Sequence, residues 1–238
     1  PKYLLFLENA FPYMDNYNYH KGMNGIIQEL TGLLKTKNIG TDSDRALLLD
    51  FQATLETKPE KAIKLEKDAL AQIETITADN ARLVSNLHAN LGGLYRMNGH
   101  PDLAREHMEK SISLLDQFNL LHINDSIPQI ANYAMFLTEQ QEPERGISEL
   151  QKLSGIIKEY HSDDCLDYAK VQETLGTIYL MTANLPQAKT HFKRAFKIYE
   201  KIWADEPEMI EAKYQEIQEL YPQIGFCIGK NLSGLLTK

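Results

Sequence analysis

Residues 171–199 read VQETLGTIYLMTANLPQAKTHFKRAFKIY. In each half of this stretch, apolar or small residues recur at spacings of three, four and seven, which places them on one face of a helix. The residues that form this pattern are Leu175, Gly176, Tyr179, Ala188, Phe192 and Ala195. The two halves are separated near residues 183–186, where Pro186 suits the first turn of a second helix. The stretch therefore predicts a hairpin of two amphipathic helices.

The same hairpin pattern recurs along the chain with a period of 42 residues. Residues 87–115, LHANLGGLYRMNGHPDLAREHMEKSISLL, match it in register at a distance of 84, and a weaker copy lies halfway, at residues 133–153. A degenerate copy lies at residues 49–69, where Asp50 and Glu66 replace the small or large apolar residues of the other copies. Each copy has a proline followed by a small residue, and these pairs are Pro59 and Ala62, Pro101 and Ala104, Pro143 and Gly146, and Pro186 and Ala188. A repeat of this length is the signature of stacked helical hairpins.

The repeats predict an all-α chain, organised as one solenoid of about five hairpins with a C-terminal capping helix. The expected repeats cover residues 3–37, 41–78, 80–120, 124–160 and 163–203, and the capping helix and tail cover residues 205–238. Side chains that cap helix N-termini stand before the expected first helices, as at Thr41 and Asn80. A polar terminal helix would cover the last apolar surface of the stack.

The composition limits the classes of partner. The chain has 238 residues, of which 43% are hydrophobic and 24% charged, so it has enough apolar material for a continuous core. Its net charge of −8 and its lack of long Lys/Arg runs argue against nucleic acid as a direct partner. The apolar run at residues 3–11 is too short to span a membrane, and two cysteines, Cys165 and Cys227, fit a reducing compartment. We therefore expect a soluble cytoplasmic protein, and the start at Pro1 without a methionine suggests a piece of a longer chain.

The Leu-Gly-x-x-Tyr, Ala, Phe, Ala spacing of these repeats resembles the tetratricopeptide repeat over residues 18–203. The 42-residue period and the phrases from Asn90 to Gly92 and from Asn132 to Ala134 resemble its kinesin-light-chain subtype. The resemblance implies a right-handed superhelix whose first helices line a concave groove, and a scaffold that binds a protein or peptide and is not an enzyme. The same subtype resembles the helper regions of many bacterial proteins. The alternative is therefore a sensor or regulatory arm of a larger bacterial signalling or transcription-regulating protein.

In the register of that family, the groove would be lined by Asn86, Asn90, Arg96, Asn132, Thr138, Lys170, Glu173 and Thr177. Asn90 and Asn132 are one repeat apart, and a carboxamide can donate and accept hydrogen bonds at once. They fit two interpretations: each pairs with the backbone of an extended peptide, or each ties adjacent hairpins together through a neighbouring carbonyl. A clamp for a peptide C-terminal carboxylate is not expected, because only Asn132 and Lys170 match the residues of such a clamp.

The sequence contains no constellation typical of a catalyst or a metal site. Its seven histidines include no pair at the i, i+4 spacing that ligands on one helix face require, so we expect surface or packing roles for them. No glycine-rich phosphate loop, nucleophile elbow or context for a nucleophilic cysteine occurs. We therefore expect no enzyme activity, no cofactor and no metal.

Overall fold

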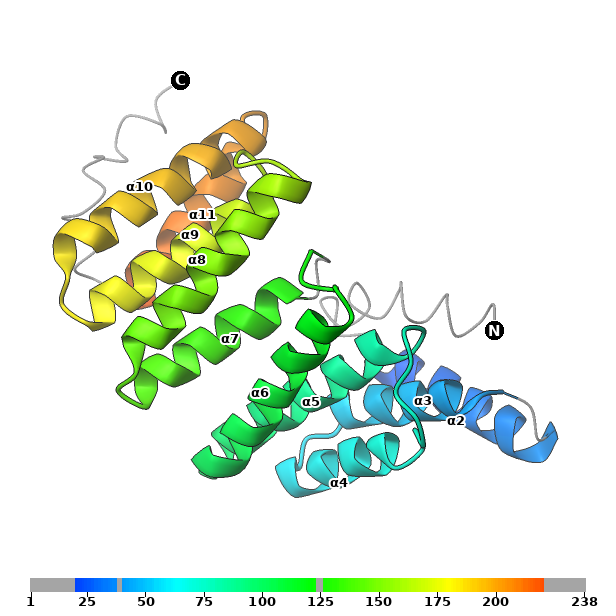
Figure 1. The fold of residues 1–238 in the computed structure, drawn as a ribbon. Helices are drawn as coiled ribbons and strands as arrows, with labels where there is room; N and C mark the ends of the chain where they lie inside the picture. Colours follow the sequence, from blue (N-terminus) through cyan, green and yellow to red (C-terminus); the bar gives the residue numbers. More distant parts are fainter. Residues whose placement is uncertain (1–19, 38–39, 123–125, 221–238) are drawn as a thin grey trace. The chain divides into compact units, whose positions relative to one another are not determined.

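The computed structural model describes residues 20–37, 40–122 and 126–220, and within them every regular element is an α-helix (Figure 1). The helices are α2 (His20–Lys37), α3 (Asp42–Thr54), α4 (Pro59–Leu70), α5 (Ala81–Met97), α6 (Pro101–Gln117), α7 (Ser126–Glu139), α8 (Pro143–Tyr160), α9 (Leu166–Met181), α10 (Leu185–Ile202) and α11 (Pro207–Leu220). The predicted all-α fold class is confirmed. The first half of the first expected hairpin and the tail after residue 220 lie outside the described residues.

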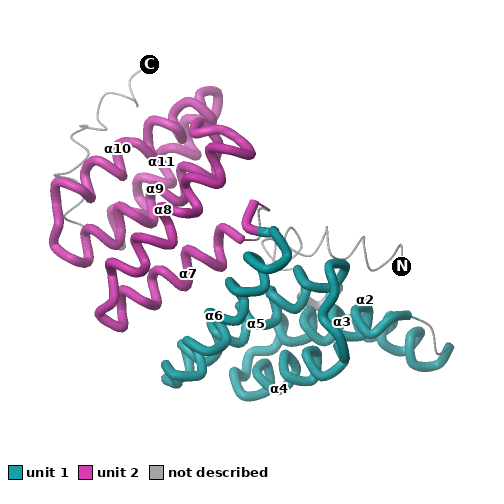
Figure 2. The backbone as a smooth tube through the Cα atoms, viewed as in Figure 1, with its two compact units in different colours: residues 1–120 teal, residues 121–238 magenta. Residues whose placement is uncertain are grey.

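The helices belong to two compact units, residues 1–120 and residues 121–238 (Figure 2). In the first unit, α3 packs against α4, and α5 packs against α6. In the second unit, α7 packs against α8, α9 packs against α10, and α11 follows on α10. The two strongest sequence repeats are therefore one hairpin in each unit, α5–α6 and α9–α10. None of the described helices is long and apolar enough to cross a membrane.

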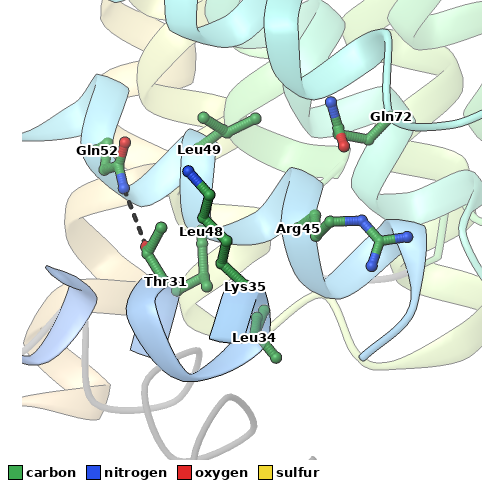
Figure 3. A pocket seen from close by; sticks show the side chains of 8 residues that line it. All are labelled: Thr31, Leu34, Lys35, Arg45, Leu48, Leu49, Gln52 and Gln72. Atoms are coloured by element: carbon green, nitrogen blue, oxygen red, sulfur yellow. Dashed lines mark hydrogen bonds between the residues drawn. The ribbon is translucent and has the colours of Figure 1, made fainter. Parts of the chain in front are cut away.

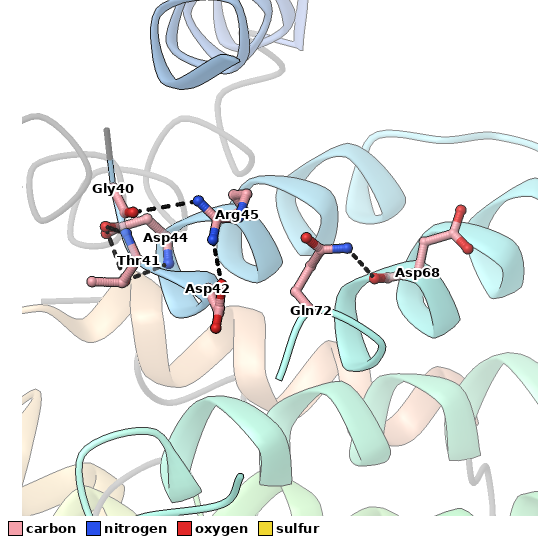
Figure 4. A network of polar contacts seen from close by, with 7 residues as sticks. All are labelled: Gly40, Thr41, Asp42, Asp44, Arg45, Asp68 and Gln72. Carbon is pink, nitrogen blue, oxygen red and sulfur yellow. Dashed lines mark hydrogen bonds and ion pairs between the residues drawn. The ribbon is translucent and has the colours of Figure 1, made fainter. Parts of the chain in front are cut away.

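Helix starts follow the prolines and caps of the sequence. A proline is the first residue of α4, α6 and α8, and Pro186 is the second residue of α10. At α3 the backbone N–H of Asp44 donates to Thr41 Oγ1 (3.1 Å) and the backbone N–H of Thr41 donates to Asp44 Oδ2 (2.7 Å), which is a capping box (Figure 4). Asn80 makes no side-chain cap to α5. It accepts instead from the backbone N–H of Thr77 (2.8 Å) and so stabilises the turn before that helix.

In each of the two strong hairpins, the two helices cross at a glycine of the first helix. A Cβ atom added to Gly92 on α5 would lie 2.6 Å from Met108 Cγ on α6. One added to Gly176 on α9 would lie 2.9 Å from Phe192 Cδ2 on α10. Because such distances are shorter than van der Waals contact, the missing side chain is what lets the large residue sit against the facing helix.

In the hairpin α7–α8, the glycine of this contact lies on the second helix and the larger residue lies on the first. Its first helix has Ala134 at the register position of the glycines above, and its glycine is Gly146 on the second helix. A Cβ atom added to Gly146 would lie 2.6 Å from Ala134 O and 3.1 Å from Ala134 Cα. Here the glycine permits the backbones themselves to approach.

Apolar side chains continue the packing from hairpin to hairpin within each unit. In the first unit a buried cluster joins α2 to α3, and it consists of Met23, Ile27, Leu48 and Phe51. In the second unit Phe196 on α10 stacks on Tyr214 on α11, with ring centroids 4.1 Å apart. The helix predicted to begin near residue 205 therefore covers an apolar surface of α10, as a capping helix does.

Candidate functional site

The predicted groove residues all lie on first helices of hairpins. The first unit contains Asn86, Asn90 and Arg96, all on α5. The second unit contains Asn132 and Thr138 on α7, and Lys170, Glu173 and Thr177 on α9. Because α7 and α9 are in contact, the residues of the second unit lie on one pair of neighbouring helices.

Asn90 connects two hairpins of the first unit. Its Nδ2 donates to Asp50 Oδ1 on α3 (2.8 Å) and to Glu66 Oε1 on α4 (3.2 Å). These bonds correspond to the second interpretation of the asparagines, in which the amide ties adjacent hairpins together. The acceptors are side-chain carboxyl groups and not backbone carbonyls. The donor group of Asn90 is thus already engaged within the chain.

The two carboxyl groups beside Asn90 share a buried site. Glu66 is almost completely buried, with 1% of its surface exposed. Burial raises the pKa of Glu66 well above its ordinary value of 4.5, and the nearby charge of Asp50 raises it further. Burial raises the pKa of Asp50 too, against the hydrogen bonds from Glu66 and Asn90, which lower it. At neutral pH the pair therefore retains a proton, and the more strongly raised pKa of Glu66 places it there.

Asp50 and Glu66 occupy the positions at which the two helices of the other hairpins cross. Asp50 lies 42 residues before Gly92, and Glu66 lies 42 residues before Met108. The degenerate copy of the repeat therefore replaces the contact of a small and a large apolar residue by a hydrogen-bonded carboxyl pair. Since buried polar groups are costly without partners, the donor from Asn90 on the next hairpin stabilises this replacement.

The second unit presents its asparagine to solvent. Asn132 is exposed on α7, and its side chain makes no hydrogen bond to any residue that the structure describes. Lys170 is exposed on the neighbouring α9, and its Nζ lies 3.8 Å from Asp167 Oδ1. Thr174 stands 42 residues after Asn132, and its hydroxyl donates to the backbone oxygen of Lys170 (3.0 Å). The α7–α9 face thus combines an available carboxamide with a weakly paired cation.

Glu173 is committed to holding the terminal helices. Its Oε1 pairs with Lys213 Nζ on α11 (2.9 Å), and its Oε2 accepts from the hydroxyl of Tyr199 on α10 (2.6 Å). Burial opposes the charge of Lys213, but Glu173 and Glu216 outweigh that effect and raise the pKa of the ammonium. Burial together with the charge of Glu173 raises the pKa of Tyr199, which stays protonated. Glu173 therefore fastens α10 and α11 to α9.

The other predicted residues are half-buried. Thr138 donates to the backbone oxygen of Ala134 in its own helix (2.9 Å). Asn86 and Arg96 on α5 interact with neighbouring residues, and Thr177 is half-buried on α9. Of the predicted set, Asn132 and Lys170 are thus the residues whose polar groups are most available to a partner.

Two histidines pack in equivalent places of the two strong hairpins. His107 on α6 stacks on Tyr95 with ring centroids 5.4 Å apart, and His191 on α10 stacks on Tyr179 at 5.2 Å. His107 Nδ1 lies 2.9 Å from His88 Nδ1, a hydrogen bond between the two rings. Burial lowers the pKa of all three imidazoles, that of His88 to about 4. They are neutral at neutral pH. Among the described residues no group of three or more His, Cys, Asp or Glu could hold a metal ion.

A cavity of about 410 Å³ lies between α2, α3 and the segment after α4 (Figure 3). The residues that line it are Thr31, Leu34, Lys35, Arg45, Leu48, Leu49, Gln52 and Gln72. Gln52 Nε2 donates to Thr31 Oγ1 across its rim (3.2 Å), while Gln72 Nε2 donates to the backbone oxygen of Asp68 (3.2 Å; Figure 4). The cavity has room for an apolar side chain. Sequence reasoning missed it because its walls come from three separate parts of the chain.

Comparison with known proteins agrees with this fold. Residues 126–201 match the family model of the tetratricopeptide repeat. Three solved structures are similar in fold. BtubC (BKLC) from P. vanneervenii is 19% identical, with a TM-score of 0.62 over 76% of this chain and 72% of that chain. A putative kinesin light chain with nearly identical TPR-like repeats from Podosopora anserina is 14% identical, with a TM-score of 0.63 over 82% of this chain and 93% of that chain.

The third structure is MamA, which is 15% identical, with a TM-score of 0.53 over 79% of this chain and 94% of that chain. A search of curated protein sequences gave no match. At these identities the likeness concerns the arrangement of the helices alone.

Proposed function

Since residues 126–201 match the tetratricopeptide repeat and the described helices share the fold of kinesin-light-chain-like repeat proteins, we propose that the chain is a scaffold that binds a protein or peptide through the first-helix surface of its second unit. Proteins with this repeat fold generally mediate contacts between proteins and are generally not enzymes. The proposed surface is the α7–α9 face, the concave side of the repeat in this family. We propose a cytoplasmic location as well, supported by the sparse cysteines, of which Cys165 is a free thiol.

The observation that carries the proposal is the exposed carboxamide of Asn132, which has no hydrogen-bond partner among the described residues. A carboxamide can donate to a backbone carbonyl and accept from a backbone N–H of the same bound segment, whatever the sequence of that segment. Lys170 on the adjacent helix adds attraction for a carboxylate. Because Glu173, Tyr199 and Lys213 hold the neighbouring helices, the receptor side loses little freedom on binding.

The two asparagines offer a matched pair of variants. With the full chain as bait in a native lysate, Asn132→Ala is expected to lose a specific captured protein while the thermal unfolding curve stays unchanged. Asn90→Ala is the control, because it removes the donor to Asp50 and Glu66. It is expected to lower the unfolding temperature and to keep the captured protein. Equal capture by the parent chain and both variants, or loss confined to Asn90→Ala, would contradict the α7–α9 surface.

A further inference from the structure

One side of helix α10 is strongly basic. The helix contains five basic residues and one acidic residue, so it has a charge of +4 in a chain whose net charge is −8. The basic residues are exposed and follow one another at successive turns, and they are Lys189, Lys193, Arg194, Lys197 and Lys201. We call this surface the α10 basic face.

The charge of the α10 basic face is largely uncompensated. Lys201 pairs with Asp164. The side chains of the other four residues form no ion pair or hydrogen bond with any residue in the described part of the chain. Like charges one turn apart on a helix repel each other. Elsewhere in the same unit basic groups have acidic neighbours, as Lys213 has in Glu173 and Glu216. Among the described residues only Asp164 forms an ion pair with this row of cations, so most of its repulsion is not relieved there.

A depression of about 350 Å³ adjoins the α10 basic face. Lys193 and Lys197 of α10 line it, and Lys158 of α8 adds a further cation, whose Nζ lies 5.2 Å from the ring centroid of Tyr168. Tyr168 and Ile198 are buried and contribute apolar surface to the depression. The site thus offers a row of cations beside a hollow that an apolar side chain can enter.

We propose that the α10 basic face and its depression bind an acidic segment of a partner protein that also contains a large apolar residue. Residues four apart on a helix are separated by about 6 Å along the axis, so carboxylates one turn apart on a partner helix can meet successive lysines. The apolar residue of the segment enters the hollow beside Tyr168 and Ile198. This surface consists of α8 and α10 residues together with Tyr168 of α9 and the segment before it, and it includes neither Asn132 nor Lys170 of the α7–α9 face.

The charges around the face favour a short protein segment over a long polyanion. Asp163 and Asp164 line the same depression as the lysines. These acids repel a nucleic acid or an anionic membrane, which extends over a wide area. A segment with a few carboxylates touches only the α10 basic face, and its apolar residue uses the hollow.

The test uses a labelled synthetic helical peptide with glutamates one turn apart and a central leucine, titrated with the full chain by fluorescence anisotropy. We expect binding that weakens as salt increases, and an affinity at least about tenfold lower for Lys193→Glu/Lys197→Glu. The matched control is Lys61→Glu/Lys64→Glu, which makes the same charge change at exposed positions of α4. Its affinity is expected to stay within about twofold of the parent chain.

Three results would overturn the proposal. One is absence of peptide binding to the parent chain, and another is an equal loss in both double variants. The third is tighter binding of a single-stranded DNA oligonucleotide or of phosphatidylserine vesicles than of the peptide. Replacing the central leucine of the peptide by serine tests the hollow, because unchanged affinity would remove the depression from the site. Far-UV circular dichroism and the milder Lys193→Gln/Lys197→Gln variant separate loss of binding from loss of folding.

Discussion

The hairpins α3–α4 and α9–α10 follow the same repeat and solve the same packing problem in opposite ways. In α9–α10 the helices cross where Gly176 accommodates the ring of Phe192. In α3–α4 the corresponding residues are Asp50 and Glu66, a pair of carboxyl groups that share a proton and accept from Asn90 of the next hairpin. The comparison shows that the repeat constrains the space between the helices and leaves open which chemistry fills it. The apolar contact is complete within one hairpin, whereas the carboxyl pair needs a hydrogen-bond donor from the neighbouring hairpin.

The largest effect is expected when the large side chain of the apolar contact in α9–α10 is truncated. Phe192→Ala removes a fully buried ring and leaves a cavity opposite Gly176, so the second unit is expected to lose about 3–5 kcal/mol of unfolding free energy. Urea unfolding followed by the fluorescence of Trp203 measures it, because this single tryptophan stacks on Tyr199 in α10. Phe192→Leu is the control and should lose much less. An unchanged midpoint for Phe192→Ala would contradict the packing described.

Introducing the apolar contact into hairpin α3–α4 is expected to stabilise the first unit. Asp50→Gly/Glu66→Met installs the pair that α5–α6 has, and it removes two desolvated carboxyl groups. Replacing a buried charged or polar pair by apolar residues of suitable volume gains about 1–4 kcal/mol in favourable cases. Urea unfolding at pH 8, followed by far-UV circular dichroism, should show the gain. The single variant Glu66→Met keeps Asp50 beside an apolar group and should gain less, so a larger gain for the single variant would be evidence against the model of a coupled pair.

The next largest effect is expected in hairpin α7–α8, whose glycine lies on the second helix. Gly146→Ala places a methyl group against the backbone of Ala134, which cannot move as a side chain can. The expected loss is about 1–3 kcal/mol, even though alanine is the better helix former. Ala134→Gly/Gly146→Ala restores the order found in α5–α6 and should recover most of the loss. Trp203 fluorescence reports both variants, and a Gly146→Ala chain as stable as the parent would rule out the close approach.

The carboxyl pair is expected to give a gradual effect, a dependence of stability on pH that is small within any one pH unit. The folded chain retains a proton on Glu66 that the unfolded chain releases above its ordinary pKa of 4.5, so stability falls as pH rises from that value through neutrality. One proton contributes at most about 1.4 kcal/mol per pH unit. Glu66→Gln mimics the protonated acid and should flatten the profile between pH 5 and pH 8. A variant with the same slope as the parent chain would mean that Glu66 is ionised in the fold.

The fold could be predicted from the sequence because its determinants are local. Pro59, Pro101 and Pro143 each begin a helix, as the repeat predicts. The small residues after the prolines are buried at the helix crossings, as Ala104 and Gly146 are. Each of these signals acts within a single hairpin, so a pattern in one stretch of sequence is enough to read it.

The candidate site could be predicted only in part, because its chemistry depends on contacts between helices. Asn90 and Asn132 have similar sequence surroundings, yet Asn90 bonds to acceptors 40 and 24 residues away. A sign of the difference was present, since the residues corresponding to Asp50 and Glu66 one repeat later are Gly92 and Met108, which have no carboxyl group. The role of Glu173 likewise depends on Lys213 of another helix.

For the α10 basic face, too, the sequence shows the residues but not their contacts with other helices. Its signal, lysines at every fourth position, stands in the sequence, from Lys189 to Lys201. A helical pattern of charges says nothing of whether acids on other helices neutralise it. Only the three-dimensional arrangement shows that most of these cations have no acidic partner in the described part of the chain.

The bonds from Asn90 to Asp50 and Glu66 also bear on how such arrays are inherited and engineered. Repeat arrays grow by duplication and exchange of single units, which requires every unit to fit any neighbour. The α3–α4 hairpin does not meet that requirement, because without an asparagine on the following hairpin its carboxyl pair lacks a donor. Hairpins α3–α4 and α5–α6 must therefore be copied, deleted or grafted together, as one cassette of two repeats.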